Sequence, residues 1–347
     1  MSHMQVNLLQ AEKMVKFILS KKLVPMISGS PGLGKSAMIH AIAKAAGLKV
    51  IDLRLSQCDV TDMNGLPSLD KLTNKASYFP MDTFPLDTDV IPAGYKGWIL
   101  FLDELSSATP NVQAAAYKVI YDRMIGQKPL HPMCYIVGAG NLETDNAVVE
   151  PMSTALASRL IHVHVKGDSK SWLDWAMKAG IDSRICDYIG WKKEAALYTF
   201  TGDTTAVTYA CPRTWVFASD LIAGEAELGN DLFLPLLAGT IGEGTAREFI
   251  SFLKIYTSLP SIDKILANPD THALPKEDNI RYALLSTLVG IADEANIEAV
   301  MTFLGRMPEE LQYYGVTSLV SRKGKMVVKT PSFKPWATKL VKFLSED

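Results

Sequence analysis

The chain has 347 residues, of which 48 % are hydrophobic, and its formal net charge is −2. This length and apolar content allow two domains with large cores, and the absence of an 18-residue apolar run argues against a membrane span. The weak net charge argues against a general nucleic-acid binder, because neutralising phosphates requires a basic surface.

The first half of the sequence alternates strand-like and helix-like segments. Apolar runs predict five strands, at residues 23–27, 49–55, 97–105, 134–138 and 160–166. Helices are predicted at 36–46, where Gly47 ends the pattern, and at 111–124, where Thr109 can cap and Pro110 suits the first position. Strands separated by helices favour a five-stranded parallel sheet covered on both faces, an α/β core over residues 1–168.

A phosphate-binding loop follows the first strand. The motif G-x-x-x-x-G-K-[ST] is matched by Gly29, Ser30, Pro31, Gly32, Leu33, Gly34, Lys35 and Ser36, with Ala37 next in the helix. The glycines let backbone N–H groups line an anion site at a helix N-terminus. Lys35 is predicted to meet the β- and γ-phosphates of a nucleotide, and the Ser36 hydroxyl to bind Mg²⁺.

An acidic pair ends the third predicted strand. Asp103 and Glu104 follow the run Trp98–Leu102, which places two carboxylates at the carboxyl edge of the sheet. Asp103 is predicted to hold Mg²⁺ and Glu104 to orient the attacking water. The alternative, a solvated acidic turn, is disfavoured by the phosphate loop.

Three further residues are candidates for nucleotide chemistry. Asn141 follows the fourth strand and can bond the lytic water and the γ-phosphate, although an Asn after glycines also suits a turn. Arg159 precedes the last strand, and we expect it to act on the nucleotide of a neighbouring subunit. The alternative for Arg159 is a solvated surface charge. Arg213 opens a helix of the second half and is a candidate phosphate contact, and its alternative is an ordinary first-turn residue.

The second half is predicted to be helical from residue 169 onward. Residues 213–222 and 245–256 give the strongest helix patterns, and 268–270 and 275–276 mark loops. Residues 308–335 are irregular and no element is predicted there.

Together these motifs resemble an AAA+ ATPase. The resemblance rests on Gly29–Ser36, Asp103-Glu104, Gly140-Asn141, residues 156–159 and Pro212-Arg213, which look like the two Walker motifs, sensor 1, arginine finger and sensor 2. Residues 59–67 and 139–145 resemble more narrowly the MoxR branch, in particular its phage and prophage members. The resemblance covers about residues 8–255. The sequence departs from the family in two places. Leu160 stands where the family often has Phe, and the tail beyond about residue 258 is longer than the usual lid.

The resemblance implies a Mg²⁺-dependent, ATP-driven hexameric ring that remodels a protein client, commonly beside a von Willebrand factor A type partner. It implies an α-helical lid at 169–258 and a helical C-terminal extension at 259–347. It also implies an inserted loop or hairpin at about 56–96 that faces the pore or the substrate. The aromatic residues of that insert, Tyr78, Phe79, Phe84 and Tyr95, could instead pack on their own sheet. Residues 126–132 are a candidate second hairpin.

Other features indicate a reducing, cytoplasmic setting. Four cysteines are scattered without C-x-x-C spacing, at Cys58, Cys134, Cys186 and Cys211. No signal-peptide pattern is evident at the N-terminus. His162 and His164 share one face of a strand, but no third ligand is evident, so Mg²⁺ is the only metal expected.

Three alternatives to a protein-remodelling ATPase stay open at this point. A nucleic-acid motor or loader would show salt-sensitive binding and stimulation by DNA or RNA. A phosphotransferase would not need the set Asn141, Arg159 and Arg213. A nucleotide-gated scaffold would bind ATP without turnover, against which the intact Glu104 speaks.

Overall fold

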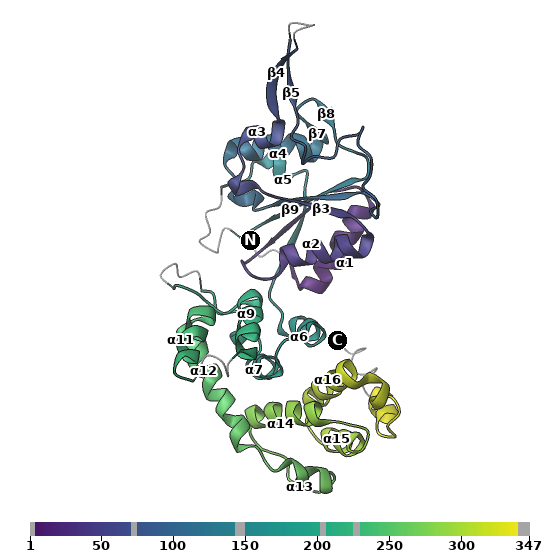
Figure 1. Cartoon of the computed structure of the whole chain (residues 1–347), viewed down its shortest axis with the longest axis vertical. Coiled ribbons are helices and arrows are strands. Elements are labelled where there is room, and N and C mark those ends of the chain that lie inside the picture. The colour runs from purple at the N-terminus through teal and green to yellow at the C-terminus, as the bar shows by residue number, and fades with distance from the viewer. Residues whose placement is uncertain (1–3, 71–74, 143–149, 202–205, 225–229, 339–347) are drawn as a thin grey trace. The chain divides into compact units, whose positions relative to one another are not determined.

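The computed structural model describes residues 4–70, 75–142, 150–201, 206–224 and 230–338. The chain divides into two compact units, residues 1–168 with 201–205 and residues 169–200 with 206–347 (Figure 1). Each unit contains its own cluster of buried apolar side chains. Within the described ranges, no helix combines the length and the apolarity that crossing a membrane requires.

The first unit is built on a parallel sheet of six strands in the order β1-β10-β2-β9-β6-β3. The strands are β1 (Gln5–Val6), β2 (Pro25–Gly29), β3 (Lys49–Arg54), β6 (Trp98–Asp103), β9 (Cys134–Gly140) and β10 (Ile161–Val165). All five predicted strands are present. The predicted count was one too low, because β1 has two residues and is too short to give an apolar pattern.

Helices cover both faces of this sheet, with α1 and α2 on one face and α3, α4 and α5 on the other (Figure 1). The helices are α1 (Leu8–Ser20), α2 (Lys35–Ala46), η1 (Leu55–Gln57), α3 (Val60–Asn64), η2 (Leu105–Ser107), α4 (Pro110–Tyr121) and α5 (Thr154–Ala157). Helix α4 ends at Tyr121 instead of at the predicted residue 124, because Arg123 takes a left-handed φ of 53° and turns the chain.

Two hairpins extend from the first unit. Strands β4 (Leu66–Asp70) and β5 (Lys75–Phe79) form one, within the predicted insert, and β7 (Met124–Ile125) and β8 (Lys128–Pro129) form the other. Tyr78 and Phe79 are 44 % and 58 % exposed on β5. Phe84, in contrast, is buried in the core beside the sheet. The alternative that the aromatic residues of the insert pack on their own sheet therefore holds for Phe84, but not for Tyr78 and Phe79.

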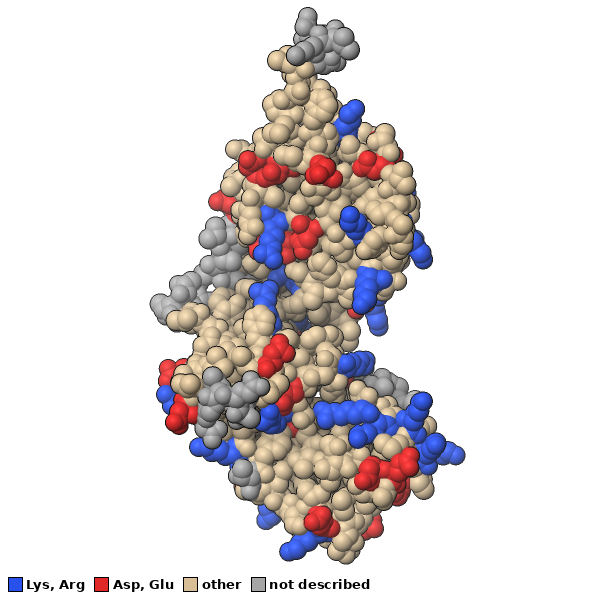
Figure 2. All heavy atoms as spheres, in the orientation of Figure 1, with Lys and Arg blue, Asp and Glu red and all other residues tan. Residues whose placement is uncertain are grey.

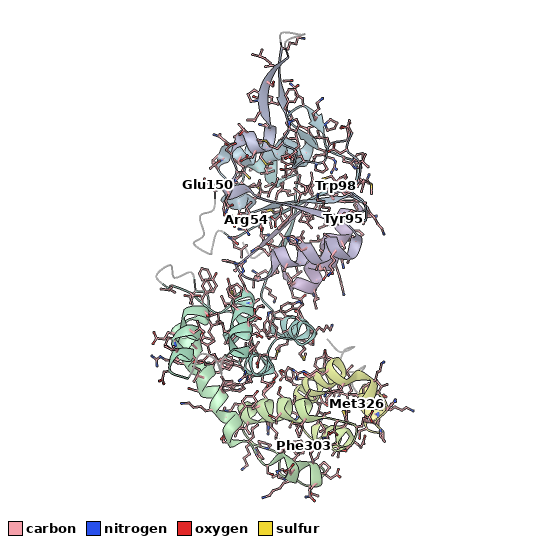
Figure 3. The ribbon with its side chains drawn as sticks, in the orientation of Figure 1. Arg54, Tyr95, Trp98, Glu150, Phe303 and Met326 are labelled. Carbon is pink, nitrogen blue, oxygen red and sulfur yellow. The ribbon has the colours of Figure 1, made fainter. Side chains whose placement is uncertain are left out.

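The register of the parallel strands fixes which residues meet at each edge of the sheet. Arg54 pairs with Asp103 at the carboxyl ends of β3 and β6, and Lys49 pairs with Trp98 at their amino ends. Figure 3 labels Arg54 at one edge and Trp98 at the opposite edge. Every residue of β2 is buried. Side chains that follow β2, β6 and β9 are thus brought to one edge.

The second unit is helical, and no strand is assigned in its described residues. Its helices are α6 (Ser169–Ala179), α7 (Ser183–Lys192), α8 (Glu194–Leu197), α9 (Pro212–Ala223), α11 (Asn230–Ile241), α12 (Glu243–Leu253), η4 (Lys254–Ser258), α13 (Ile262–Ala267), α14 (Asp278–Ile291), α15 (Ile297–Leu304) and α16 (Glu309–Val327). One apolar cluster runs from Trp172 on α6 to Val327 on α16. A separate lid and extension therefore stay a proposal.

Helix α16 occupies the segment for which no element was predicted. Gly315 and Gly324 lie inside it and weaken the helical pattern of the sequence, and in the structure Lys323 departs from helical geometry with φ −133°. Gly315 has a packing role, because a Cβ there would lie 3.0 Å from Leu285 Cδ1 on α14. The close approach of α14 and α16 thus requires a residue of low helix propensity.

A fully buried carboxylate, Asp187, lies in the core of the second unit. It accepts hydrogen bonds from the hydroxyl of Tyr256 and, at 3.0 Å, from that of Tyr314. Burial raises the pKa of Asp187 to about 7, and the hydroxyl donors and Arg322 oppose the rise. The Asp187 carboxylate thus links α7 to η4 and α16 through these two hydrogen bonds.

Candidate functional site

The loop between β2 and α2 has the backbone geometry of an anion site. Gly32 and Gly34 take left-handed φ values of 81° and 93°, which favour glycine. Gly34 is the N-cap of α2 and offers no side chain to the first turn. The helix dipole at this N-terminus favours a negatively charged ligand.

Lys35 links this loop to the end of β9. Its side chain is buried, and Nζ donates to the carbonyl oxygens of Gly29 at 2.6 Å and Ser30 at 3.1 Å. Nζ also donates to Asn141 Oδ1 at 3.2 Å, across 106 positions of sequence. The ammonium group is thus held at the mouth of the loop, beside the amide of Asn141.

Ser36 and Asp103 form a second link, between α2 and β6. The Ser36 hydroxyl donates to Asp103 Oδ2 at 2.9 Å, and Asp103 Oδ1 accepts the backbone N–H of Glu104 at 2.9 Å. A hydroxyl beside a carboxylate is an oxygen donor set that suits Mg²⁺. In the described ranges no group of three or more His, Cys, Asp or Glu side chains could hold a metal.

Glu104 has a strained backbone, with φ 56° and ψ 31° in the left-handed region. Its carboxylate accepts a hydrogen bond from the hydroxyl of Ser56, in η1 just after β3. Non-glycine residues in this region cost about 1–3 kcal/mol and cluster at functional sites. The contact with Ser56 holds the Glu104 carboxylate beside the segment that follows β3.

Asn141 is held by Ser106, which follows the acidic pair. The Asn141 N–H donates to Ser106 Oγ at 3.1 Å, and the Ser106 hydroxyl donates to Asn141 O at 3.4 Å. The preceding Gly140 is required, since a Cβ there would lie 2.4 Å from Ser106 Oγ. Sequence reasoning missed Ser56 and Ser106. The sequence feature that could have identified them is a hydroxyl side chain two or three residues after a strand that ends at this edge of the sheet.

Arg159 lies apart from this cluster. It follows α5 and precedes β10 by two residues, and Ile161 of β10 pairs with Pro25 at the amino end of β2. The phosphate loop begins at the opposite end of β2, one strand length away. The Arg159 guanidinium lies over the rings of Tyr117 and Tyr121 on α4, at 4.7 and 4.4 Å.

The other predicted site residues have varied surroundings. Leu33 is buried in the loop, while Ser30 and Pro31 are half-buried and Ala37 is exposed. Arg213 is exposed in the first turn of α9, in the second unit, and its predicted contact with phosphate stays a proposal. Residues 143–145, part of the segment that resembles the MoxR branch, lie outside the described residues.

Features elsewhere do not extend the site. All four cysteines are free thiols. The rings of His162 and His164 stack with their centroids 6.4 Å apart.

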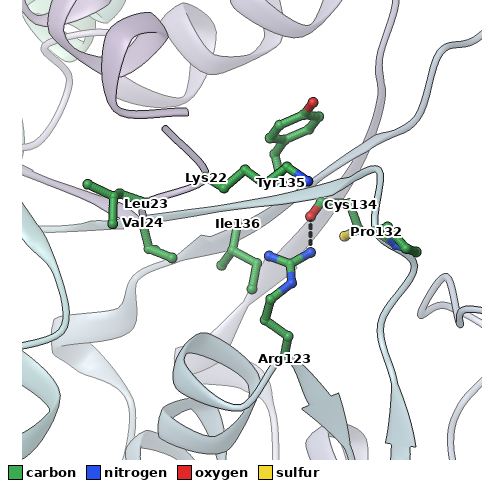
Figure 4. Close-up of a pocket in the computed structure, with 8 residues that line it drawn as sticks. All are labelled: Lys22, Leu23, Val24, Arg123, Pro132, Cys134, Tyr135 and Ile136. Carbon is green, nitrogen blue, oxygen red and sulfur yellow. Dashed lines mark hydrogen bonds between the residues drawn. The ribbon is translucent and has the colours of Figure 1, made fainter. Parts of the chain in front are cut away.

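Figure 4 draws a pocket lined by Lys22–Val24, Arg123, Pro132 and Cys134–Ile136, where Arg123 donates to the carbonyl of Cys134 at 2.5 Å. These residues flank the amino ends of β2 and β9, so this pocket lies at the edge opposite the phosphate loop.

A phosphate loop at the carboxyl edge of a helix-covered parallel sheet, followed by a helical region, defines the α/β phosphate-loop fold of nucleoside triphosphatases. Residues 25–163 match the model of the ATPase family associated with various cellular activities (AAA).

Solved structures with a similar course of the chain are remote in sequence. A putative ATPase from Cytophaga hutchinsonii is 12 % identical over 90 % of this chain and 81 % of its own, with a TM-score of 0.37. NtrX from Brucella abortus is 14 % identical over 99 % and 69 %, with a TM-score of 0.41. The RuvB Holliday junction branch migration motor of Thermotoga maritima is 18 % identical over 86 % of each chain, with a TM-score of 0.36. These likenesses carry no inference about function.

Proposed function

We propose that this protein is a Mg²⁺-dependent AAA+ ATPase of the MoxR type, which acts as a ring and remodels a protein client. One observation carries the proposal. Residues that follow three separate strands meet at a single edge of the sheet, joined by the contacts Lys35–Asn141 and Ser36–Asp103. A cation, a hydroxyl–carboxylate pair and an amide are the groups that hydrolysis of a nucleoside triphosphate needs in one place.

Each side chain has a role that follows from its position. The N–H groups of the loop and Lys35 hold the β- and γ-phosphates, and Asn141 bonds the γ-phosphate and the attacking water. Ser36 and Asp103 would hold Mg²⁺, which neutralises charge on the phosphate oxygens when bound. Glu104 orients the water and takes its proton as the oxygen attacks the γ-phosphorus, and ADP leaves. Ser56 holds the Glu104 carboxylate by donating to it.

The position of Arg159 supports a role across a subunit boundary. The sheet register places Arg159 beyond the amino end of β2, whereas the phosphate loop follows its carboxyl end. Five residues of strand span about 16 Å, and the guanidinium is bound to α4 on its own side. We therefore assign Arg159 to the γ-phosphate of an adjacent copy. AAA proteins typically oligomerise, and we propose a hexameric ring.

The hairpin β4–β5 is the surface that we assign to the client. Leu66, Leu69, Tyr78 and Phe79 are each more than 40 % exposed on it. Exposed apolar groups that cluster mark interaction sites more often than isolated ones do. Figure 2 shows both basic and acidic side chains on the face drawn, with a group of Lys and Arg on the second unit. The formal net charge of −2 gives no support to a general nucleic-acid surface.

Phosphate release by the purified protein tests the proposal. Turnover per subunit is expected to rise with protein concentration, and Arg159→Ala is expected to lose turnover by about 10³-fold while keeping ATP affinity. Full activity of Arg159→Ala would overturn the trans role. Stimulation by DNA or RNA at low salt would support the nucleic-acid motor instead.

A capture experiment tests the client. Glu104→Gln protein with ATP is expected to retain the client, and the same protein with Leu69→Ser and Phe79→Ser is expected to lose it without losing ATP. Equal capture by both would refute the assignment of the hairpin. A von Willebrand factor A type protein among the captured species would identify the expected partner.

A further inference from the structure

Two tyrosines of α4 hold the guanidinium of Arg159. Tyr117 and Tyr121 are one helical turn apart, with ring centroids 5.9 Å from one another and ring planes inclined by 31°. The guanidinium carbon lies 4.7 Å from the first ring centroid and 4.4 Å from the second. Both distances lie within the range in which a cation over an aromatic face is attracted to it.

Hydrogen bonds fix one side of the same guanidinium. Arg159 Nη1 donates to the carbonyl of Ala155 at 2.8 Å and to Ser158 Oγ at 3.2 Å. Nε is buried without a hydrogen-bond partner, and Nη2 makes no hydrogen bond within the described residues. The guanidinium thus lies over two rings and is hydrogen-bonded through Nη1, which leaves Nη2 for a ligand.

The surroundings place this group at a surface and not in a core. Tyr121 is 59 % exposed, and Arg159 and Tyr117 are half-buried. Tyr117 also packs against the apolar core of the first unit, so the pair has a rigid base. A second copy of the chain can approach the exposed side, where Nη2 would meet its phosphate.

We propose that Tyr117 and Tyr121 are positioning residues that hold Arg159 ready for the γ-phosphate bound by an adjacent copy. The inference rests on the proposed trans role of Arg159. An arginine on a flexible stem loses rotational freedom when it binds an anion, and stacking removes part of that freedom beforehand. Aromatic faces achieve this without neutralising the charge, as a carboxylate partner would, so the cation keeps its attraction for phosphate.

A purely structural reading of the contact makes a different prediction. If the rings only cover apolar surface, replacing them should change thermal stability and leave the turnover number of the folded protein unchanged. If they position Arg159, the loss should appear in kcat, with the KM for ATP and its affinity unchanged. Phe should substitute for Tyr in both positions, since ring faces and not hydroxyl groups contact the guanidinium.

The first experiment measures kcat and ATP affinity for Tyr117→Leu, Tyr121→Leu and the double variant. We expect the double variant to lose about tenfold in kcat and the two Tyr→Phe variants to stay within about twofold of the parent. Phe17→Leu is the matched control, because it removes a cation–aromatic contact of the same kind, with Lys21 at 5.4 Å, on α1 of the same unit. In an Arg159→Ala background the Leu changes should have no further effect.

The second experiment mixes subunits, which keeps the test valid if a Leu variant is less stable. Glu104→Gln subunits cannot hydrolyse ATP but carry an intact Arg159 and both tyrosines. Mixing them with the Tyr117→Leu/Tyr121→Leu variant should give more turnover than the sum of the separate preparations. The rescued activity would come from Leu-variant sites that face an intact neighbour.

The outcomes separate failure of the inference from failure of the proposed function. Wild-type kcat in the Leu variants, together with an inactive Arg159→Ala variant, would overturn the positioning role of the tyrosines and keep the trans role of Arg159. Turnover of the mixed subunits that only equals the sum of the separate preparations would lead to the same conclusion. An active Arg159→Ala variant would overturn the trans role, and the positioning inference with it.

Discussion

Ser36 and Asp103 lie 67 positions apart in the chain and are joined by a 2.9 Å hydrogen bond from hydroxyl to carboxylate. Ser36 lies in the first turn of α2, which follows β2, and Asp103 ends β6, so the contact depends on β9 between these two strands. This single relationship brings the loop that binds phosphate and the strand that carries the acidic pair into one site.

The Ser36 hydroxyl is expected to contribute more to the binding of Mg²⁺ than to the binding of the nucleotide. Ser36→Ala should raise the Mg²⁺ concentration at half-maximal turnover by about tenfold or more, because one oxygen donor is lost. ATP binding in EDTA should change little. Ser20→Ala is a suitable control, since the Ser20 hydroxyl bonds only the carbonyl of Phe17 at the end of α1. An unaltered Mg²⁺ dependence would remove Ser36 from the metal site.

Glu104→Gln should separate binding from turnover. The amide keeps the size of the side chain but cannot take a proton from water, so turnover should fall by about 100-fold or more while ATP still binds. Multiple-turnover phosphate release and equilibrium nucleotide binding measure the two quantities. Glu12→Gln, which removes only an exposed ion pair with Lys16, should behave as the parent. Undiminished turnover in Glu104→Gln would show that another group activates the water.

Gly140→Ala should destabilise the first unit. A Cβ at this position would lie 2.4 Å from Ser106 Oγ and 2.9 Å from Ser106 Cβ, and overpacking of this kind costs about 1–3 kcal/mol. Urea unfolding measures the loss. Adding Ser106→Gly removes both of these atoms and should recover part of it. Gly167→Ala, whose Cβ would make an ordinary 3.4 Å contact with Leu33, should be nearly neutral. Equal stability of the two alanine variants would contradict the contact.

Asp187 should make the second unit less stable as pH rises. Its folded-state pKa of about 7 lies above the usual pKa of an aspartate, 3.8. Because the folded state then binds a proton that the unfolded state releases, this contribution to stability is complete below about pH 4 and is lost as pH rises through 7.

Comparison with Asp187→Asn isolates this effect from other titrations. The variant should lose less stability than the parent between pH 5 and pH 8, by about 2–4 kcal/mol, measured by urea unfolding with Trp fluorescence. Glu310→Gln, which removes a surface partner of Lys193, is the control. Parallel pH profiles for the parent and Asp187→Asn would show that the carboxyl group stays ionised in the folded state.

The sequence predicts those elements and motifs whose pattern lies within a short stretch of the chain. Five strands of the sheet, and α2, α4, α9 and α12, follow from apolar periodicity and from turn residues such as Gly47 and Gly126. The phosphate loop and the acidic pair could be predicted because their spacing is short and their place after a strand is fixed. Which strands are neighbours could not be read locally, since β2 lies between β9 and β10.

Other features depend on contacts between distant residues. Ser56 was missed because its link to Glu104 joins the ends of β3 and β6. The stack of Arg159 on Tyr117 and Tyr121 joins α4 to the segment before β10. Helix α16 was missed for a related reason: Gly315 weakens the helical pattern, and its purpose is visible only against Leu285 of α14.

The strand order of the first unit also has a consequence for biosynthesis. Strand β2 leaves the ribosome early, but both of its partners come more than 100 positions later, at Cys134–Gly140 and Ile161–Val165. Pairings of such long sequence separation form slowly. A nascent chain that stops short of β10 therefore leaves at least one edge of the apolar strand β2 unpaired. Fragments that end before residue 161 are expected to aggregate during expression, even though they contain every residue of the phosphate loop.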